Sequence, residues 1–209
     1  MKILALELSS GRGSIAFVEN GEARFAVEFA NDRKHSGAFF ENLQRLTADW
    51  DVPNRIVVGT GPGSHAGVRI AIATAVGLQA ATGAELIGIP SICAVPTSLD
   101  EFCVIGDARR QTFYRALIRT GMCAEGPALY GEDELRAILA TTAVAVFCTE
   151  RLAQFPEAQI VTPSAALLAR LAERMPSETA TTPIEPMYLR GPHITYPKAV
   201  PFQLPSQHR

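Results

Sequence analysis

The sequence predicts an α/β protein in which mixed sheets are flanked by helices. Three apolar runs near the start have the length and composition of strands, at residues 3–8, 14–18 and 23–29. Asn20-Gly21 separates the last two runs and is a strong hairpin signal, so we expect an antiparallel meander. Strands and helices then alternate, which is typical of a partly parallel sheet covered by helices.

The remaining elements follow in chain order. An apolar stripe predicts a helix over residues 35–50, with Ser36 as its N-cap. A strand at 55–60, a glycine-rich turn, a helix to about residue 82 and a strand at 85–89 come next. In the second half we expect paired strands at 102–106 and 112–119, a helix at 133–140, a strand at 143–147, and a helix at 164–175 capped by Ser164.

Composition narrows the possible functions. The chain has 209 residues, 47% hydrophobic and 19% charged, so it can bury a core, and its net charge is −2. The arginines are scattered, so strong independent nucleic-acid binding is not expected. The four cysteines are far apart and form no C-x-x-C pair, so we expect free thiols and no metal. With neither a signal segment nor a membrane-spanning stretch, a cytoplasmic protein is expected.

The segment from Gly61 to Ile70, GPGSHAGVRI, is the most informative in the chain. It joins a strand to a helix, where glycines let a ligand or another backbone approach and the helix N-terminus can hold an anion. Two interpretations remain open. The segment is a phosphate-binding turn, or it is a tight turn shaped by Gly61 and Gly63 in which Ser64 only caps the helix.

The helix after this turn is apolar on almost every side, whereas a surface helix needs only one apolar stripe. In one interpretation the preceding helix covers this apolar surface completely, but that helix has an apolar stripe of its own to bury. We therefore expect the two helices to form a partner interface. The expected contact residues are Phe39, Phe40, Leu43, Leu46, Val68, Ile72 and Val76.

Five segments in order resemble the TsaB family, which supplies the dimerisation subunit of the bacterial complex that makes threonylcarbamoyladenosine in tRNA. They are residues 3–10, His35-Ser36, residues 61–70, Asp107-Ala108-Arg109-Arg110 with Tyr114, and Tyr188-Leu189-Arg190. The resemblance, also described as glycoprotease-like, implies an actin-like, Hsp70-like (ribonuclease H-like) two-lobed fold. The expected division is an N-terminal lobe at 1–96, a smaller lobe at 97–190 and a tail at 191–209.

The resemblance also implies a non-catalytic role. The chain would bind and activate a larger catalytic homologue, TsaD, and through it meet the ATPase subunit TsaE and tRNA. In isolation it would form a homodimer, since the family's first two helices pack against the same pair on the partner.

In actin-like ATPases the corresponding turns hold a nucleotide, so a vestigial site is expected at Glu7, Ser9, Gly61, Gly63, Ser64 and Asp107. Glu7-Leu8-Ser9 stands where the family usually has Asp-Thr-Ser, and His65-Ala66 where it has Phe-Thr. We therefore expect no required cofactor, at most weak ATP or ADP binding, and no catalytic residue. For Asp107 with Arg109 and Arg110, a solvated turn held by an ion pair is an equally good interpretation.

An alternative function is an actin-like ATP-dependent small-molecule kinase, although the chain is short for that class. Metal-dependent peptidase activity is not expected, because no two of the four histidines have the spacing that places both on one metal. A classical P-loop is excluded because no lysine occurs between Lys34 and Lys198, so none lies in or directly after the glycine turn.

Overall fold

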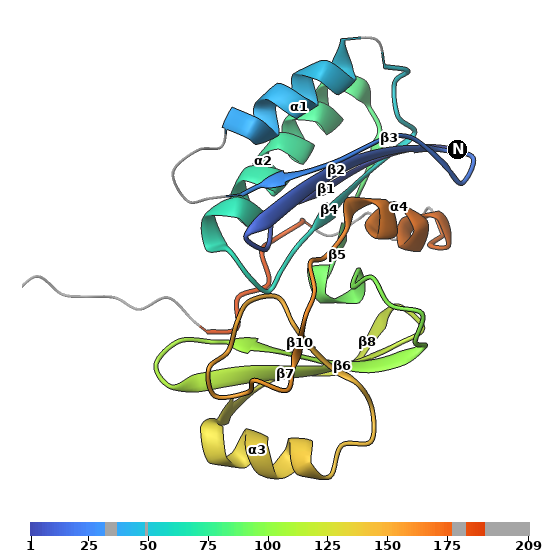
Figure 1. Cartoon of the computed structure of the whole chain (residues 1–209). Coiled ribbons are helices and arrows are strands. Elements are labelled where there is room, and N and C mark those ends of the chain that lie inside the picture. Colours follow the sequence, from blue (N-terminus) through green and yellow to red (C-terminus); the bar gives the residue numbers. More distant parts are fainter. Residues whose placement is uncertain (32–36, 49, 177–182, 191–209) are drawn as a thin grey trace, which may run out of the picture.

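The computed structural model describes residues 1–31, 37–48, 50–176 and 183–190. Its elements stack in layers (Figure 1). From top to bottom these are helices α1 and α2, a first sheet, helix α4, a second sheet and helix α3. The start of the predicted first helix, with His35 and Ser36, and the predicted tail at 191–209 lie outside the described residues.

The first sheet has the order β3-β2-β1-β4-β5. Its strands are β1 (Lys2–Glu7), β2 (Arg12–Glu19), β3 (Glu22–Ala30), β4 (Arg55–Gly59) and β5 (Glu85–Ile89). β1, β2 and β3 pair antiparallel, which confirms the predicted meander, while β4 runs parallel to both β1 and β5. Asn20 and Gly21 have φ of 50° and 82°, as a two-residue hairpin turn requires.

The second sheet has the order β10-β9-β6-β7-β8, which repeats the first when read from its β8 edge. Its strands are β6 (Glu101–Asp107), β7 (Thr112–Arg119), β8 (Met122–Gly131), β9 (Val146–Cys148) and β10 (Gln159–Ile160). β8 and β10 were not predicted, and the strand expected at 143–147 is displaced to β9. β8 is largely exposed and contains Gly126-Pro127, so it lacks the apolar run that reveals a strand.

The helices are α1 (Gly37–Thr47), α2 (His65–Thr82), α3 (Glu132–Ala140) and α4 (Ala165–Glu173), with a short 3₁₀ turn η1 (Ser91–Cys93). Ser64 caps α2 as predicted, because its side chain accepts a hydrogen bond from the Gly67 amide at 3.3 Å. Ser164 makes no such bond. The hydroxyl of Ser14, from β2, instead accepts from the first amide of α4, that of Ala165, at 2.9 Å.

Helix α4 crosses the expected division into lobes. It follows the second sheet in sequence and falls within 97–190, yet it packs on β1, β2 and β4 of the first sheet. One hydrophobic core joins the inner faces of both sheets to α4, including Ile3, Phe102 and Leu168. The division at residue 97 stays a prediction, and α4 is an element of the second segment that packs on the first sheet.

The other faces of the sheets have their own cores. Between the first sheet and helices α1 and α2 lie residues such as Leu6, Phe39 and Val68. Between the second sheet and α3 lie residues such as Ile105 and Leu135. All four cysteines are free, and Cys123 alone among them is not buried. In the described part of the chain, no group of side chains has the makings of a metal site, and no helix is both long and apolar enough to cross a membrane.

Candidate functional site

The glycine turn packs against the chain's own β1–β2 turn. The Ser64 amide donates a hydrogen bond of 2.6 Å to the carbonyl oxygen of Ser9. A Cβ added at Gly63 would lie 2.1 Å from that oxygen, and one added at Gly67 would lie 2.1 Å from the carbonyl oxygen of Leu8. Only glycine at these two positions leaves room for the backbone of the β1–β2 turn. The Ser64 amide, at the start of α2, already has the Ser9 carbonyl as its hydrogen-bond acceptor.

Glu7 lies beneath this turn and is completely buried. Its Oε1 accepts a hydrogen bond from the Ser9 amide at 2.6 Å, while its Oε2 has no hydrogen-bond partner among the described residues. A Cβ on Gly59 would lie 1.8 Å from Oε2, so only glycine fits beside it. Burial raises the pKa of the Glu7 carboxyl, and the hydrogen bond from the Ser9 amide opposes that rise. The environment thus favours a neutral carboxyl, whereas magnesium needs a charged one.

The structure brings five of the six predicted nucleotide-site residues together but places Asp107 on the second sheet. There its Oδ1 accepts from the Arg109 amide at 2.6 Å and its Oδ2 pairs with the Arg109 guanidinium at 2.9 Å. These contacts lie within its own turn. The simpler of the two interpretations, a solvated turn held by an ion pair, describes them.

A C-terminal segment passes close to the glycine turn, which the sequence did not indicate. The Met187 amide donates a 2.8 Å hydrogen bond to the carbonyl of Thr60. The ring of Tyr188 lies 5.5 Å from that of His65, at the start of α2. The only signal for this segment was the Tyr188-Leu189-Arg190 match, to which no role was attached.

The predicted interface residues divide into two groups. Five are buried in the chain's own core, because their stripes face the first sheet: Phe39, Leu43, Leu46, Val68 and Ile72. Phe40 and Val76 are both 47% exposed. The predicted partner interface is therefore limited to the side of α1 and α2 that faces away from the first sheet. On α2 that side consists of Ala73, Val76, Gly77 and Ala80, at the spacing of one helical face.

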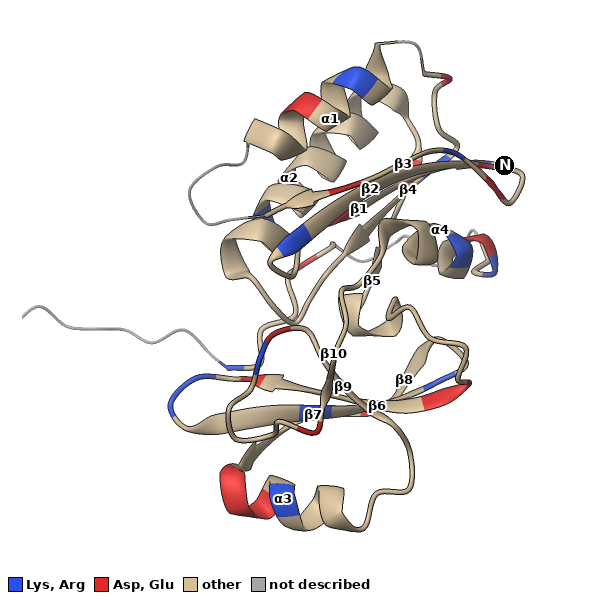
Figure 2. Ribbon diagram, viewed as in Figure 1, with Lys and Arg blue, Asp and Glu red and all other residues tan. Residues whose placement is uncertain are grey.

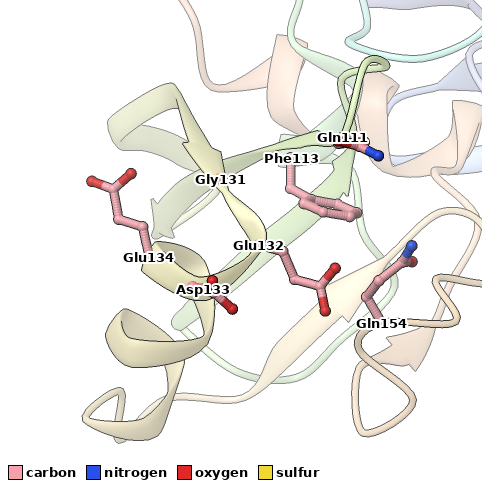
Figure 3. A pocket seen from close by; sticks show the side chains of 7 residues that line it. All are labelled: Gln111, Phe113, Gly131, Glu132, Asp133, Glu134 and Gln154. Atoms are coloured by element: carbon pink, nitrogen blue, oxygen red, sulfur yellow. The ribbon is translucent and has the colours of Figure 1, made fainter.

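Two pockets lie away from the predicted site residues. One, of about 560 Å³, is in the second lobe and is shown in Figure 3. It is lined by Gln111, Phe113, Gly131, Glu132, Asp133, Glu134 and Gln154. The other, of about 220 Å³, lies between β2, β3 and the start of α4. Neither contains a residue predicted to bind a nucleotide or a partner.

Comparison with known proteins gives three kinds of match. The family model "TsaD: tRNA N6-adenosine threonylcarbamoyltransferase" matches residues 30–126. The uncharacterized protein Rv3421c of Mycobacterium tuberculosis (strain H37Rv) is 30% identical over 165 residues, which are 77% of this chain and 77% of that protein. An uncharacterized protein of Mycobacterium leprae is 37% identical over 75 residues, which are 35% of this chain but 21% of that protein.

Among solved structures, YeaZ from Pseudomonas aeruginosa has a TM-score of 0.67 at 24% identity. A second P. aeruginosa protein, described as similar to peptidase YEAZ, has a TM-score of 0.69 at 22% identity. Each match covers 90% of this chain and 99% of the other. This likeness and the repeated sheet order confirm the predicted actin-like α/β fold. The chain therefore belongs to one family with the M. tuberculosis protein, has the fold of YeaZ, and matches the TsaD family model over residues 30–126.

Proposed function

We propose that the chain is a non-catalytic scaffold subunit in the cytoplasmic synthesis of threonylcarbamoyladenosine in tRNA. It binds and activates a larger TsaD-type homologue, and through that protein it meets a TsaE-type ATPase and tRNA. In the absence of the homologue it pairs with a second copy of itself. The observation that carries this proposal is the outer face of α1 and α2, where Phe40 and Val76 are each 47% exposed.

This outer face suits a helical partner. Fully burying a valine or phenylalanine side chain contributes about 1.5–3 kcal/mol, and about half of each of these two remains to be buried. The small side chains of Ala73, Gly77 and Ala80 let a facing helix approach closely, since interaxial distance depends on the residues at the contact. In Figure 1 both helices lie on the far side of the first sheet from the second lobe, so a partner there leaves the rest of the chain undisturbed.

The packing of the glycine turn supports the absence of catalysis. The carbonyl oxygen of Ser9 already accepts from the Ser64 amide, and the carbonyl oxygens of Leu8 and Ser9 lie against Gly67 and Gly63 at the start of α2. These oxygens carry partial negative charge, which disfavours an anion beside them. The kinase alternative requires this turn to open, and no observation favours it.

The experiment that tests the proposal places a charge on the outer face. Val76→Arg is expected to abolish co-purification with the larger homologue and to stop tRNA modification, because an unpaired buried charge is very unfavourable. Ala137→Arg is the matched control, since Ala137 is also exposed on a helix but lies on α3. Ile72→Asp does not serve here, because Ile72 is buried within the chain and its loss would unfold the protein. A Val76→Arg variant that assembles as well as the control would refute the proposal.

A further inference from the structure

The turn between β6 and β7 presents two neighbouring arginines in a fixed backbone shape. Arg109, Arg110 and Gln111 have φ of 65°, 55° and 58°, in the left-handed region that side chains usually avoid. Asp107 holds the turn through the Arg109 amide and guanidinium, and the Thr112 hydroxyl donates to the Arg109 carbonyl at 2.8 Å. Both arginine side chains are exposed. The backbone conformation of this turn is therefore strained, and it holds two guanidinium groups at the surface.

The C-terminal segment brings a third arginine and an aromatic ring to the same place. The Arg190 guanidinium donates a hydrogen bond to the Thr112 hydroxyl, which fixes it beside the turn. Tyr188 is two residues earlier, so its Cα lies within about 7 Å of that of Arg190. Its side chain is 50% exposed and its ring lies 5.5 Å from that of His65. The segment from Tyr188 to Arg190 thus links His65, at the start of α2, with Thr112, at the β6–β7 turn.

Charge is unevenly distributed over this part of the molecule. Arg69 is also exposed on α2, but it is four residues before Ala73 and shares the outer face assigned to the homologue, so it is not counted here. Within the described ranges, Arg110 has no ion-pair partner, whereas Arg109 is paired with Asp107. Figure 2 shows the basic residues of the β6–β7 turn beside those at the end of the described chain. The excess of positive charge is local, because the whole chain carries −2.

We propose that five of these residues form an RNA-contacting surface, called here the arginine surface: His65, Arg109, Arg110, Tyr188 and Arg190. Guanidinium groups bind phosphate oxygens in a bidentate manner, and aromatic rings stack on the unpaired bases of single-stranded loops. An exposed tyrosine among arginines favours RNA over an acidic protein segment, which has no bases to stack.

This inference rests on the proposed function, in which the larger homologue brings tRNA to the chain. A few phosphate contacts give weak affinity alone, so the surface adds to binding within the complex and does not replace it.

The test uses the complex of the full chain with its larger homologue and a labelled, unmodified tRNA transcript, followed by fluorescence anisotropy over a range of salt concentrations. Arg109→Ala with Arg110→Ala is expected to weaken RNA binding about tenfold and to reduce the slope of log affinity against log salt by about 1.5–2. Arg110→Ala alone leaves the Asp107 pair intact and should give about half of that change in slope. Arg119→Ala is the matched control, because Arg119 is 56% exposed at the opposite end of β7.

Each outcome decides the proposal. RNA affinity and salt slope equal to those of the control would overturn it. Loss of assembly with the homologue, rather than of RNA affinity, would also overturn it and would assign the surface to a protein partner. If the wild-type chain does not assemble, the proposed function fails. The same titration on the chain alone then decides the surface. Weaker RNA binding by the variants supports it, and equal or absent binding rejects it.

Discussion

Replacing Gly67 or Gly77 with alanine should change the stability of the chain in opposite directions. Both residues lie in α2. Inside a helix, glycine is about 0.8–1.0 kcal/mol less favourable than alanine. Helix propensity alone therefore predicts that both variants are more stable than the native chain, with a smaller gain for Gly67 because it is in the first turn.

The atoms around Gly67 reverse the stability change that helix propensity predicts for its alanine variant, whereas those around Gly77 do not. A Cβ at Gly67 would lie 2.1 Å from the Leu8 carbonyl oxygen, whereas one at Gly77 would meet no atom of the described chain within 4 Å. The Leu8 oxygen belongs to a backbone turn that the hydrogen bond from Ser64 to Ser9 holds in place, so it cannot rotate away like a side chain. Overpacking costs about 1–3 kcal/mol. We expect Gly67→Ala to be less stable by about 1–2 kcal/mol, and Gly77→Ala to be more stable by about 0.5–1 kcal/mol.

Thermal and urea unfolding of the two variants measure this difference. One kcal/mol shifts Tm by about 2–4 °C in a chain of this size, so the variants should melt about 3–12 °C apart. Similar urea m-values would show that both unfold from the same compact state. If Gly67→Ala melts at or above Gly77→Ala, the Leu8 carbonyl does not restrict this position, and the close packing of the β1–β2 turn on α2 is wrong.

Three further predictions test other parts of the structure. Glu7→Gln should remove a pH dependence. Because the pKa of Glu7 is raised in the folded state, the contribution of Glu7 to stability is greatest below its unfolded pKa of about 4.3 and is lost as pH rises toward the folded value. Urea unfolding at several pH values should therefore show the advantage of the glutamine variant increasing with pH. Arg55→Met should lower the free energy of unfolding by about 3–5 kcal/mol, because buried Arg55 pairs with Glu85 at 2.8 Å and donates to the Ala172 carbonyl of α4. A urea midpoint equal to that of the native chain would contradict this. Magnesium-ATP at millimolar concentration should leave Tm unchanged, whereas a nucleotide-binding kinase would be stabilised by its ligand.

The elements that sequence analysis located correctly are those with local signals. The meander follows from apolar runs and Asn-Gly, and α2 follows from its cap and its apolar length. β8 was missed because its residues are mostly exposed and Gly126-Pro127 interrupts them. The position of α4 was missed for a different reason. Its contacts with β1 and Arg55 join residues more than 100 apart in the sequence, and no local pattern encodes them.

The candidate site shows a related limit. A glycine-rich turn indicates that something approaches the backbone closely, but it does not say what. Here the carbonyls of Ser9 and Leu8 lie against Gly63 and Gly67, so backbone packing alone accounts for the close approach at these two glycines, and nucleotide binding stays a prediction. The apolar residues of α1 and α2 were ambiguous in a similar way, because the sequence does not say whether each one packs on its own sheet or on a partner. Phe39 and Phe40 are adjacent apolar residues in the sequence, yet the first is 2% exposed and the second 47%.

Gly77 supplies the sharpest remaining test of the outer helix face. It lowers the stability of α2, and a Cβ there would meet nothing in the described chain, so its own fold gives no reason for a glycine. A glycine is expected at such a place when a second backbone comes close to it. Gly77→Leu should therefore leave the Tm of the isolated monomer unchanged or higher while weakening assembly with the larger homologue at least tenfold, an effect of about 1.4 kcal/mol or more. Assembly is measured by titration calorimetry, with Ala137→Leu on α3 as the control. If Gly77→Leu binds the homologue with native affinity, no partner helix approaches α2 at this position.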